Sequence, residues 1–174
     1  MRREKNSAAD IPATPQNRDM VRDEAIRRIE RFRARSSRGL WAMALFIAVS
    51  IAALGDFSFL PALPETVRAL LGRPPSPTMI SGALVLYTFS AIILILARMM
   101  GGSEQSGGFA HVGYLTAFYV FYHFAHAMDE NFWAVFVAGL TVLGLESYHI
   151  WTFCSDAIRK EQEVLDAIER ARQL

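Results

Sequence analysis

The chain has 174 residues, of which 52% are hydrophobic and 20% are charged, and its formal net charge is only +1. A single cysteine, Cys154, excludes an intrachain disulfide framework and any CxxC redox or metal motif. The charges gather at both ends and leave residues 40–154 largely apolar, whereas a soluble domain alternates polar and apolar positions more finely. The composition therefore predicts an all-α polytopic membrane protein, with four transmembrane helices and a charged cytoplasmic helix before the first and after the last.

The first 39 residues divide into two parts. Residues 1–17 contain two prolines and no apolar period, which predicts a disordered tail. From 18 to 39, Ala25, Ile29 and Phe32 recur at three- and four-residue spacing among arginines, a pattern typical of a basic amphipathic helix. No aromatic platform accompanies the charge, so a nucleic-acid partner is not expected. Contacts with anionic lipid headgroups or with a partner subunit are expected at Arg27, Arg28, Arg31, Arg35 and Arg38.

Four apolar stretches follow, each close to the ~20 residues needed to cross a hydrocarbon core. Tryptophans lie near the ends of these stretches, where an aromatic belt places them. The connection at 61–78 is rich in proline, and that at 98–108 is rich in glycine and serine. The predicted spans are 40–60, 79–97, 109–128 and 132–154, the last two joined by residues 128–131.

Lysine and arginine near the span ends predict the orientation. One side of the membrane collects nearly all of them, while the other has only Arg68 and Arg73. The positive-inside rule therefore predicts that both termini are cytoplasmic, with a bacterial inner (plasma) membrane as the expected location. Residues 155–174 form a second charged helix with a narrow apolar stripe, expected to continue the fourth span and to pack on the basic helix or on another subunit.

A carboxylate lies deep in the last apolar stretch. Glu146 and His149 are three residues apart and share a helix face, and antiparallel spans bring His111 to a similar depth. A carboxylate inside a membrane is costly unless it is paired or protonated, and no basic side chain is expected nearby. These three residues are therefore proton or ion candidates. The alternative is a neutral Glu146 whose hydrogen bonds hold helices together.

The third stretch also carries a polar arc, which a helix in lipid should turn inward. Near the predicted outer surface, His123 and His126 approach the depth of Asp56, and imidazole with carboxylate could hold a metal ion. The alternative is two histidines that are only solvated or hydrogen-bonded. The residues of the arc are Thr116, Tyr119, Tyr122, His123 and His126.

Two further hypotheses concern a cofactor and a pore. His111 and His149 could be the axial ligands of one haem b, and the aromatic third stretch would also suit a quinone. On the first stretch, residues spaced by four and three would line a ring of subunits, with Asp56 as an acidic ring that selects cations. The residues of this stripe are Arg31, Arg35, Arg38, Ala42, Leu45, Val49, Ala52 and Asp56.

The small predicted mass outside the membrane and the absence of any nucleotide-binding or catalytic motif favour a non-enzymatic protein. The leading prediction is a four-span protein that acts in an assembly, as a homo-oligomer or as an accessory subunit of a larger membrane complex. The alternatives are a proton or cation conduit, which uses Glu146, His149 and His111 or an Asp56 ring, and a redox subunit that binds haem b or quinone.

Overall fold

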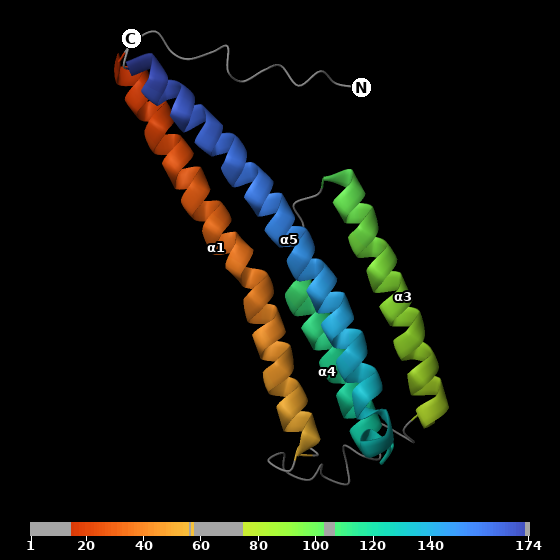
Figure 1. Ribbon diagram of the computed structural model, residues 1–174. Coiled ribbons are helices and arrows are strands. Elements are labelled where there is room, and N and C mark those ends of the chain that lie inside the picture. Colours follow the sequence, from red (N-terminus) through yellow and green to blue (C-terminus); the bar gives the residue numbers. More distant parts are fainter. Residues whose placement is uncertain (1–14, 56, 58–74, 103–106, 173–174) are drawn as a thin grey trace. The chain divides into compact units, whose positions relative to one another are not determined.

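The computed structural model describes residues 15–55, 57, 75–102 and 107–172, all of them in helices or short turns and connections. The helices are α1 (Pro15–Leu54), α3 (Pro77–Gly101), α4 (Gly108–Phe124) and α5 (Met128–Arg172) (Figure 1). The expected all-helical fold is therefore present. Asp56 and the greater part of 61–78 and of the tail 1–17 lie outside the described residues.

Three helices are long and apolar enough to cross a membrane: those within Asp19–Leu54, Pro77–Gly101 and Met128–Ala171. The protein is thus a membrane protein by the length and composition of its helices. Helix α4 has only 17 residues, so it is about 26 Å long and short of a ~30 Å hydrocarbon core. The third predicted span, 109–128, is therefore not confirmed as a full crossing, and neither is the count of four spans.

The helix bounds differ from the predicted spans. Helix α1 ends at Leu54 rather than at residue 60, and α3 extends the second span at both ends, to Pro77 and Gly101. The turn before α5 lies at residues 125–127, so α5 begins at Met128, four residues before the predicted start. Asp129 and Glu130 then fall in the first turn of α5. Acidic side chains stabilise that end of a helix, because its unpaired N–H groups carry partial positive charge.

The chain forms two compact units. Unit 1 comprises 1–37 and 150–174, and unit 2 comprises 38–149. In unit 1, the first part of α1 and the last part of α5 run antiparallel around a small apolar core that includes Ala25, Ile29 and Ile168. Phe32 contacts Phe153 edge-on with ring centroids 6.5 Å apart. Arg28 forms ion pairs with Glu24 at 2.6 Å and with Glu161 at 3.3 Å.

Unit 2 is built around a stack of aromatic rings from three helices. Phe46 of α1, fully buried, stacks on Tyr119 of α4 and on Phe136 of α5, with centroids 6.2 and 6.1 Å apart. Each such pair contributes about 0.5–1.5 kcal/mol beyond its area burial. Gly139 makes the stack possible, because a Cβ atom there would lie 2.1 Å from the Phe46 ring. α1 and α5 therefore approach closely at this level.

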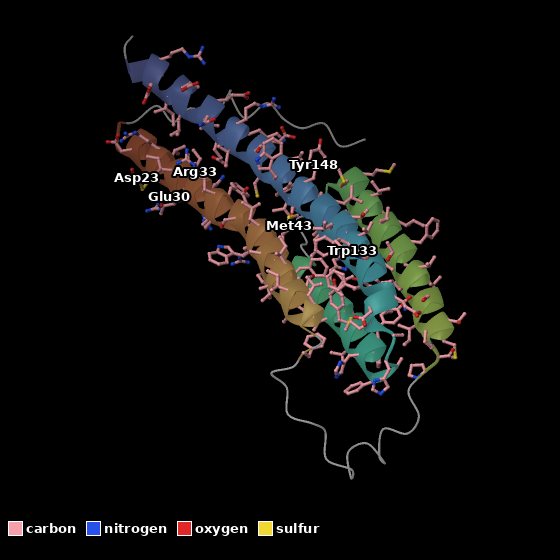
Figure 2. The ribbon with its side chains drawn as sticks, turned by 60° about the horizontal axis from the view of Figure 1, so that its bottom comes forward. Asp23, Glu30, Arg33, Met43, Trp133 and Tyr148 are labelled. Atoms are coloured by element: carbon pink, nitrogen blue, oxygen red, sulfur yellow. The ribbon has the colours of Figure 1, made fainter. Side chains whose placement is uncertain are left out.

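Helix α3 joins this unit more loosely. Ile80 and Leu84 reach the main core, and Ala91 and Ile95 form a smaller cluster with Val142. Most of its other large apolar side chains are exposed, as are Trp133 and Tyr148 on α5, which are labelled in Figure 2. An apolar surface of this kind is what contact with lipid requires.

Candidate functional site: the buried carboxylate at the start of α4

The best-formed polar site in unit 2 lies where α4 begins. Helix α4 starts without a side-chain cap of its own, since Gly107 occupies the N-cap position. A carboxylate from α5 supplies the missing acceptor: the backbone N–H of Gly107 donates to Oε1 of Glu146. A negative charge is favoured there, because the first N–H groups of a helix have no partner within the helix.

Glu146 is almost completely enclosed, with 1% of its surface exposed. Its second oxygen, Oε2, has no hydrogen-bond partner among the described residues. The Nη1 atom of Arg98 is likewise buried and has no hydrogen-bond partner among them. That nitrogen lies 3.3 Å from the position that a Cβ atom on Gly107 would take. The expectation that no basic side chain is near Glu146 is therefore wrong. The end of α3 brings Arg98 to the glycine that Glu146 holds.

His111 completes the site one turn into α4. Its Nδ1 is 2.8 Å from the Tyr87 hydroxyl of α3, and its backbone N–H donates to the Gly107 carbonyl at 3.0 Å. Its Nε2 lies 3.4 Å from the position of a Cβ on Gly107, and the ring is within electrostatic range of both Glu146 and Arg98. His149, also buried, follows Glu146 by three residues on α5. Of the proton and ion candidates, Glu146 and His111 lie near Gly107, and His149 is buried further along α5.

The site lies near one end of the apolar part of α5, not at its middle. Glu146 follows Met128 by 18 residues along one continuous helix, which corresponds to about 27 Å. That distance is close to the full ~30 Å of a hydrocarbon core. A carboxylate and a guanidinium at this depth cost less than at the bilayer centre, because the arginine stem can extend toward the interface.

The polar arc of α4 turns inward over part of its length. Tyr119 and Tyr122 are fully buried; Tyr119 donates to Ser50 at 3.1 Å, and the Tyr122 hydroxyl lies 2.8 Å from Ser81 Oγ. Thr116 hydrogen-bonds the carbonyl of Val112 in its own helix. These bonds tie α4 to α1 and to α3, which is a packing role.

His123 and His126 have different positions at the other end of α4. The His123 ring meets Phe57 edge-on at 5.8 Å. His126 is exposed and has a left-handed backbone with φ of 52°. Among the described residues, no group of three His, Cys, Asp or Glu side chains is arranged to hold a metal ion. The suggested third ligand, Asp56, lies outside them.

The haem and pore hypotheses gain no geometric support. Nδ1 of His111 is engaged by Tyr87, and its Nε2 lies against the first turn of α4, where an axial ligand would need open space. On α1, Ala42 is buried inside unit 2, 3.2 Å from where a Cβ on Gly108 would lie. A pore lining along this stripe would need Ala42 to face outward.

Sequence reasoning missed Gly107, Arg98 and Tyr87. The two adjacent glycines at 107 and 108 fall in the connection 98–108, whose glycine and serine content predicts a loop. The signal was the absence of Ser, Thr, Asp or Asn immediately before an apolar helix, because such a helix needs an acceptor from elsewhere. No family model, no curated protein and no solved structure matches this chain.

Proposed function

We propose that the protein is a non-enzymatic membrane protein that acts in an assembly, as a homo-oligomer or as a subunit of a larger complex, through the charged helical pair of unit 1. The observation that supports this proposal is the length of the two helices. Helix α1 has 40 residues and α5 has 45, about twice the ~20 that a membrane crossing needs. The surplus of each is charged, and the two pair through Arg28 with Glu161 and Phe32 with Phe153.

One arginine face of α1 forms none of the described ion pairs of unit 1. Arg28 is engaged by Glu24 and Glu161, whereas Arg27 and Arg31 lie one turn apart on an exposed face of α1. This face is proposed to contact anionic headgroups on the cytoplasmic side of a bacterial inner membrane, each arginine contributing about 1 kcal/mol. Arg33, labelled in Figure 2, is also exposed but is six residues beyond Arg27, on another side of the helix.

The assembly is tested by the particle mass of the full chain in nanodiscs, measured by native mass spectrometry. More than one copy, or a co-purified membrane subunit, is the expected result; a single copy with no partner at all protein concentrations contradicts the proposal. The headgroup contact is tested by replacing Arg27 and Arg31 together with Gln. Retention of anionic lipid should fall, whereas Arg33→Gln, the matched control, should leave it unchanged.

The proposed orientation has both termini in the cytoplasm, which requires α4 to complete a crossing despite its length. A reporter that is active only in the cytoplasm should be active when fused after residue 174 and silent when fused after Pro74. Activity at Pro74 with silence at residue 174 would reverse the orientation, and silence at both positions would mean three crossings from a cytoplasmic N-terminus.

Proton handling is a second candidate, favoured by the enclosed Glu146 with one oxygen lacking a partner. Glu146→Gln keeps the shape of the side chain and removes its titration. In reconstituted vesicles, a conduit should lose proton flux with this change and keep its assembly state. Equal flux for the wild type and the Gln variant would leave Glu146 without a transport role.

A further inference from the structure

We propose that Glu146 is a proton-operated latch: its ionised carboxylate holds the start of α4, and protonation releases it. This inference concerns unit 2 alone and stands whether or not the protein assembles or moves protons. It goes beyond a relay, because its output is a change in the connection between α3 and α4 rather than a proton delivered elsewhere.

The contact between Glu146 and Gly107 depends on the charge of the carboxylate. The Gly107 N–H donates to Glu146 Oε1, and a hydrogen bond to an ionised carboxylate is about twice as strong as one to a neutral acceptor. The unpaired N–H groups at the start of α4 favour the same charge. Protonation removes both contributions together, and the remaining neutral oxygen is a weaker cap.

Among the described residues, the start of α4 has one other side-chain tie to a neighbouring helix, the His111–Tyr87 hydrogen bond one turn further on. Gly107 has no side chain, and α4 has no side-chain cap of its own. Gly108 lies between Ala42 of α1 and the Glu146 stem, where a Cβ would be 3.2 Å from the former and 3.9 Å from the latter. Gly108 thus lets α4 approach α1 closely, and the carboxylate supplies a polar contact between α4 and α5.

Titratable and charged groups come to this region from the helices around Glu146. Helix α3 brings Arg98, and Tyr87 through its bond to His111. Helix α4 brings His111, α5 adds His149, and α1 presents the apolar Ala42. The enclosed carboxylate, with 1% of its surface exposed, thus lies close to two sources of positive charge, Arg98 and the first N–H groups of α4.

The experiment measures hydrogen exchange of the α4 first turn, residues 107–112, by mass spectrometry of the full chain in nanodiscs over a descending pH series. Rates are corrected for the intrinsic pH dependence of exchange. The variants are Glu146→Gln, which keeps an acceptor oxygen but no charge, and Glu146→Leu, which keeps neither. Glu130→Gln is the matched control, since Glu130 is an exposed carboxylate on the same helix.

At neutral pH we expect exchange to be about tenfold faster in the Leu variant, and by a smaller factor, about threefold, in the Gln variant. Acidification should accelerate the wild type toward the Gln rate and leave the Gln variant unchanged. An acid-dependent rise that persists in the Gln variant would assign the effect to His111 or His149 and overturn the proposal. Identical rates in all three proteins would overturn it as well.

If the Leu variant does not fold, two measurements keep the test decisive. The wild-type pH series needs no variant, and Gly107→Ala disturbs the latch from the opposite side by pressing on Arg98 and His111. The Ala variant should raise exchange of the same turn while keeping an acid response. If neither acidification nor Gly107→Ala changes the exchange of residues 107–112, the latch does not exist.

Discussion

The two ends of α4 are terminated in opposite ways. At the amino end, the Gly107 N–H donates to a carboxylate from α5, and the buried Nη1 atom of Arg98 lies near the same glycine. At the carboxyl end, the backbone satisfies itself: Ala127 N–H donates to the Tyr122 carbonyl and His126 N–H to that of His123, at 3.0 and 3.1 Å. This is a Schellman motif, with His126 in the left-handed position that usually holds glycine.

The comparison shows which polar residues of the apolar stretches form contacts between helices through their side chains. The pair His123 and His126 resembles a metal-binding pair in sequence, yet one of its members serves the turn through its backbone. Glu146, by contrast, engages another helix through its side chain, and its second oxygen has no hydrogen-bond partner among the described residues. A pattern of ligand types is therefore weaker evidence than an enclosed group that lacks a partner.

The largest effect is expected between the two ends, where α1 and α5 meet. Gly139→Ala places a methyl group 2.1 Å from the Phe46 ring, so the aromatic stack must shift. The free energy of unfolding in detergent should fall by about 3 kcal/mol, with both ends of α4 losing protection together. Gly144→Ala, on the same helix but with open space around it, is the control; an equal loss there would mean that helix propensity and not packing is responsible.

Removing the latch should affect only the amino end. Glu146→Leu leaves the Gly107 N–H without its acceptor and should lower the free energy of unfolding by about 0.6–2 kcal/mol, the range for interhelical hydrogen bonds in membranes. Chemical unfolding curves check the loss, and hydrogen exchange locates it at residues 107–112. Equal loosening at the turn 125–127 would contradict the independence of the two ends.

A methyl group added at Gly107, at the same end of α4, should lower the free energy of unfolding by a smaller amount. Gly107→Ala brings a methyl group to 3.3 Å from Arg98 Nη1 and 3.4 Å from His111 Nε2, contacts that a flexible arginine can partly relieve. We expect a loss of about 1 kcal/mol in the same unfolding measurement. Gly113→Ala, where no atom lies within 4 Å, should be neutral or slightly stabilising.

The carboxyl end should respond in the opposite direction. His126→Gly removes the cost of a left-handed backbone at a residue with a Cβ atom and should raise the free energy of unfolding by about 0.5–1 kcal/mol. The reverse change at the start of the α3–α4 connection, Gly102→Ala with φ of 62°, should lower it. A loss of stability in the His126→Gly variant would mean that the imidazole itself makes a contact that matters.

The smallest effect is expected from an exposed carboxylate of unit 1. The hydrogen bond from Arg28, followed by its charge, lowers the pKa of Glu24 below its usual value. Any stabilisation from this pair is therefore present above the ordinary glutamate pKa and is lost as the pH falls through the lowered one. Because Glu24 is solvent-exposed, added salt should weaken the pair. Arg28→Gln should hardly change the melting of unit 1 in high salt, and a large salt-independent loss would point instead to Glu161.

Much of the helical architecture follows from sequence alone. Apolar stretches near 20 residues predict membrane helices, because unpaired backbone groups are too costly in lipid for any other form. The sequence alone also predicts a basic amphipathic helix at residues 18–39. It singles out Glu146 as a carboxylate inside an apolar stretch and predicts a similar depth for His111 and His149. These are local properties, set by composition, by helical period and by the rise per residue.

What only the tertiary structure decided is which polar groups meet. The cap of α4 comes from a residue 39 positions away, and Arg98 reaches it from a third helix, so no local pattern contains the site. The turn at 125–127 was misplaced for a related reason: His126 adopts a left-handed backbone that its residue type does not favour, and the Schellman hydrogen bonds hold it there. Propensity describes a residue in isolation, whereas caps, close glycine contacts and buried charges depend on what neighbouring helices bring to them.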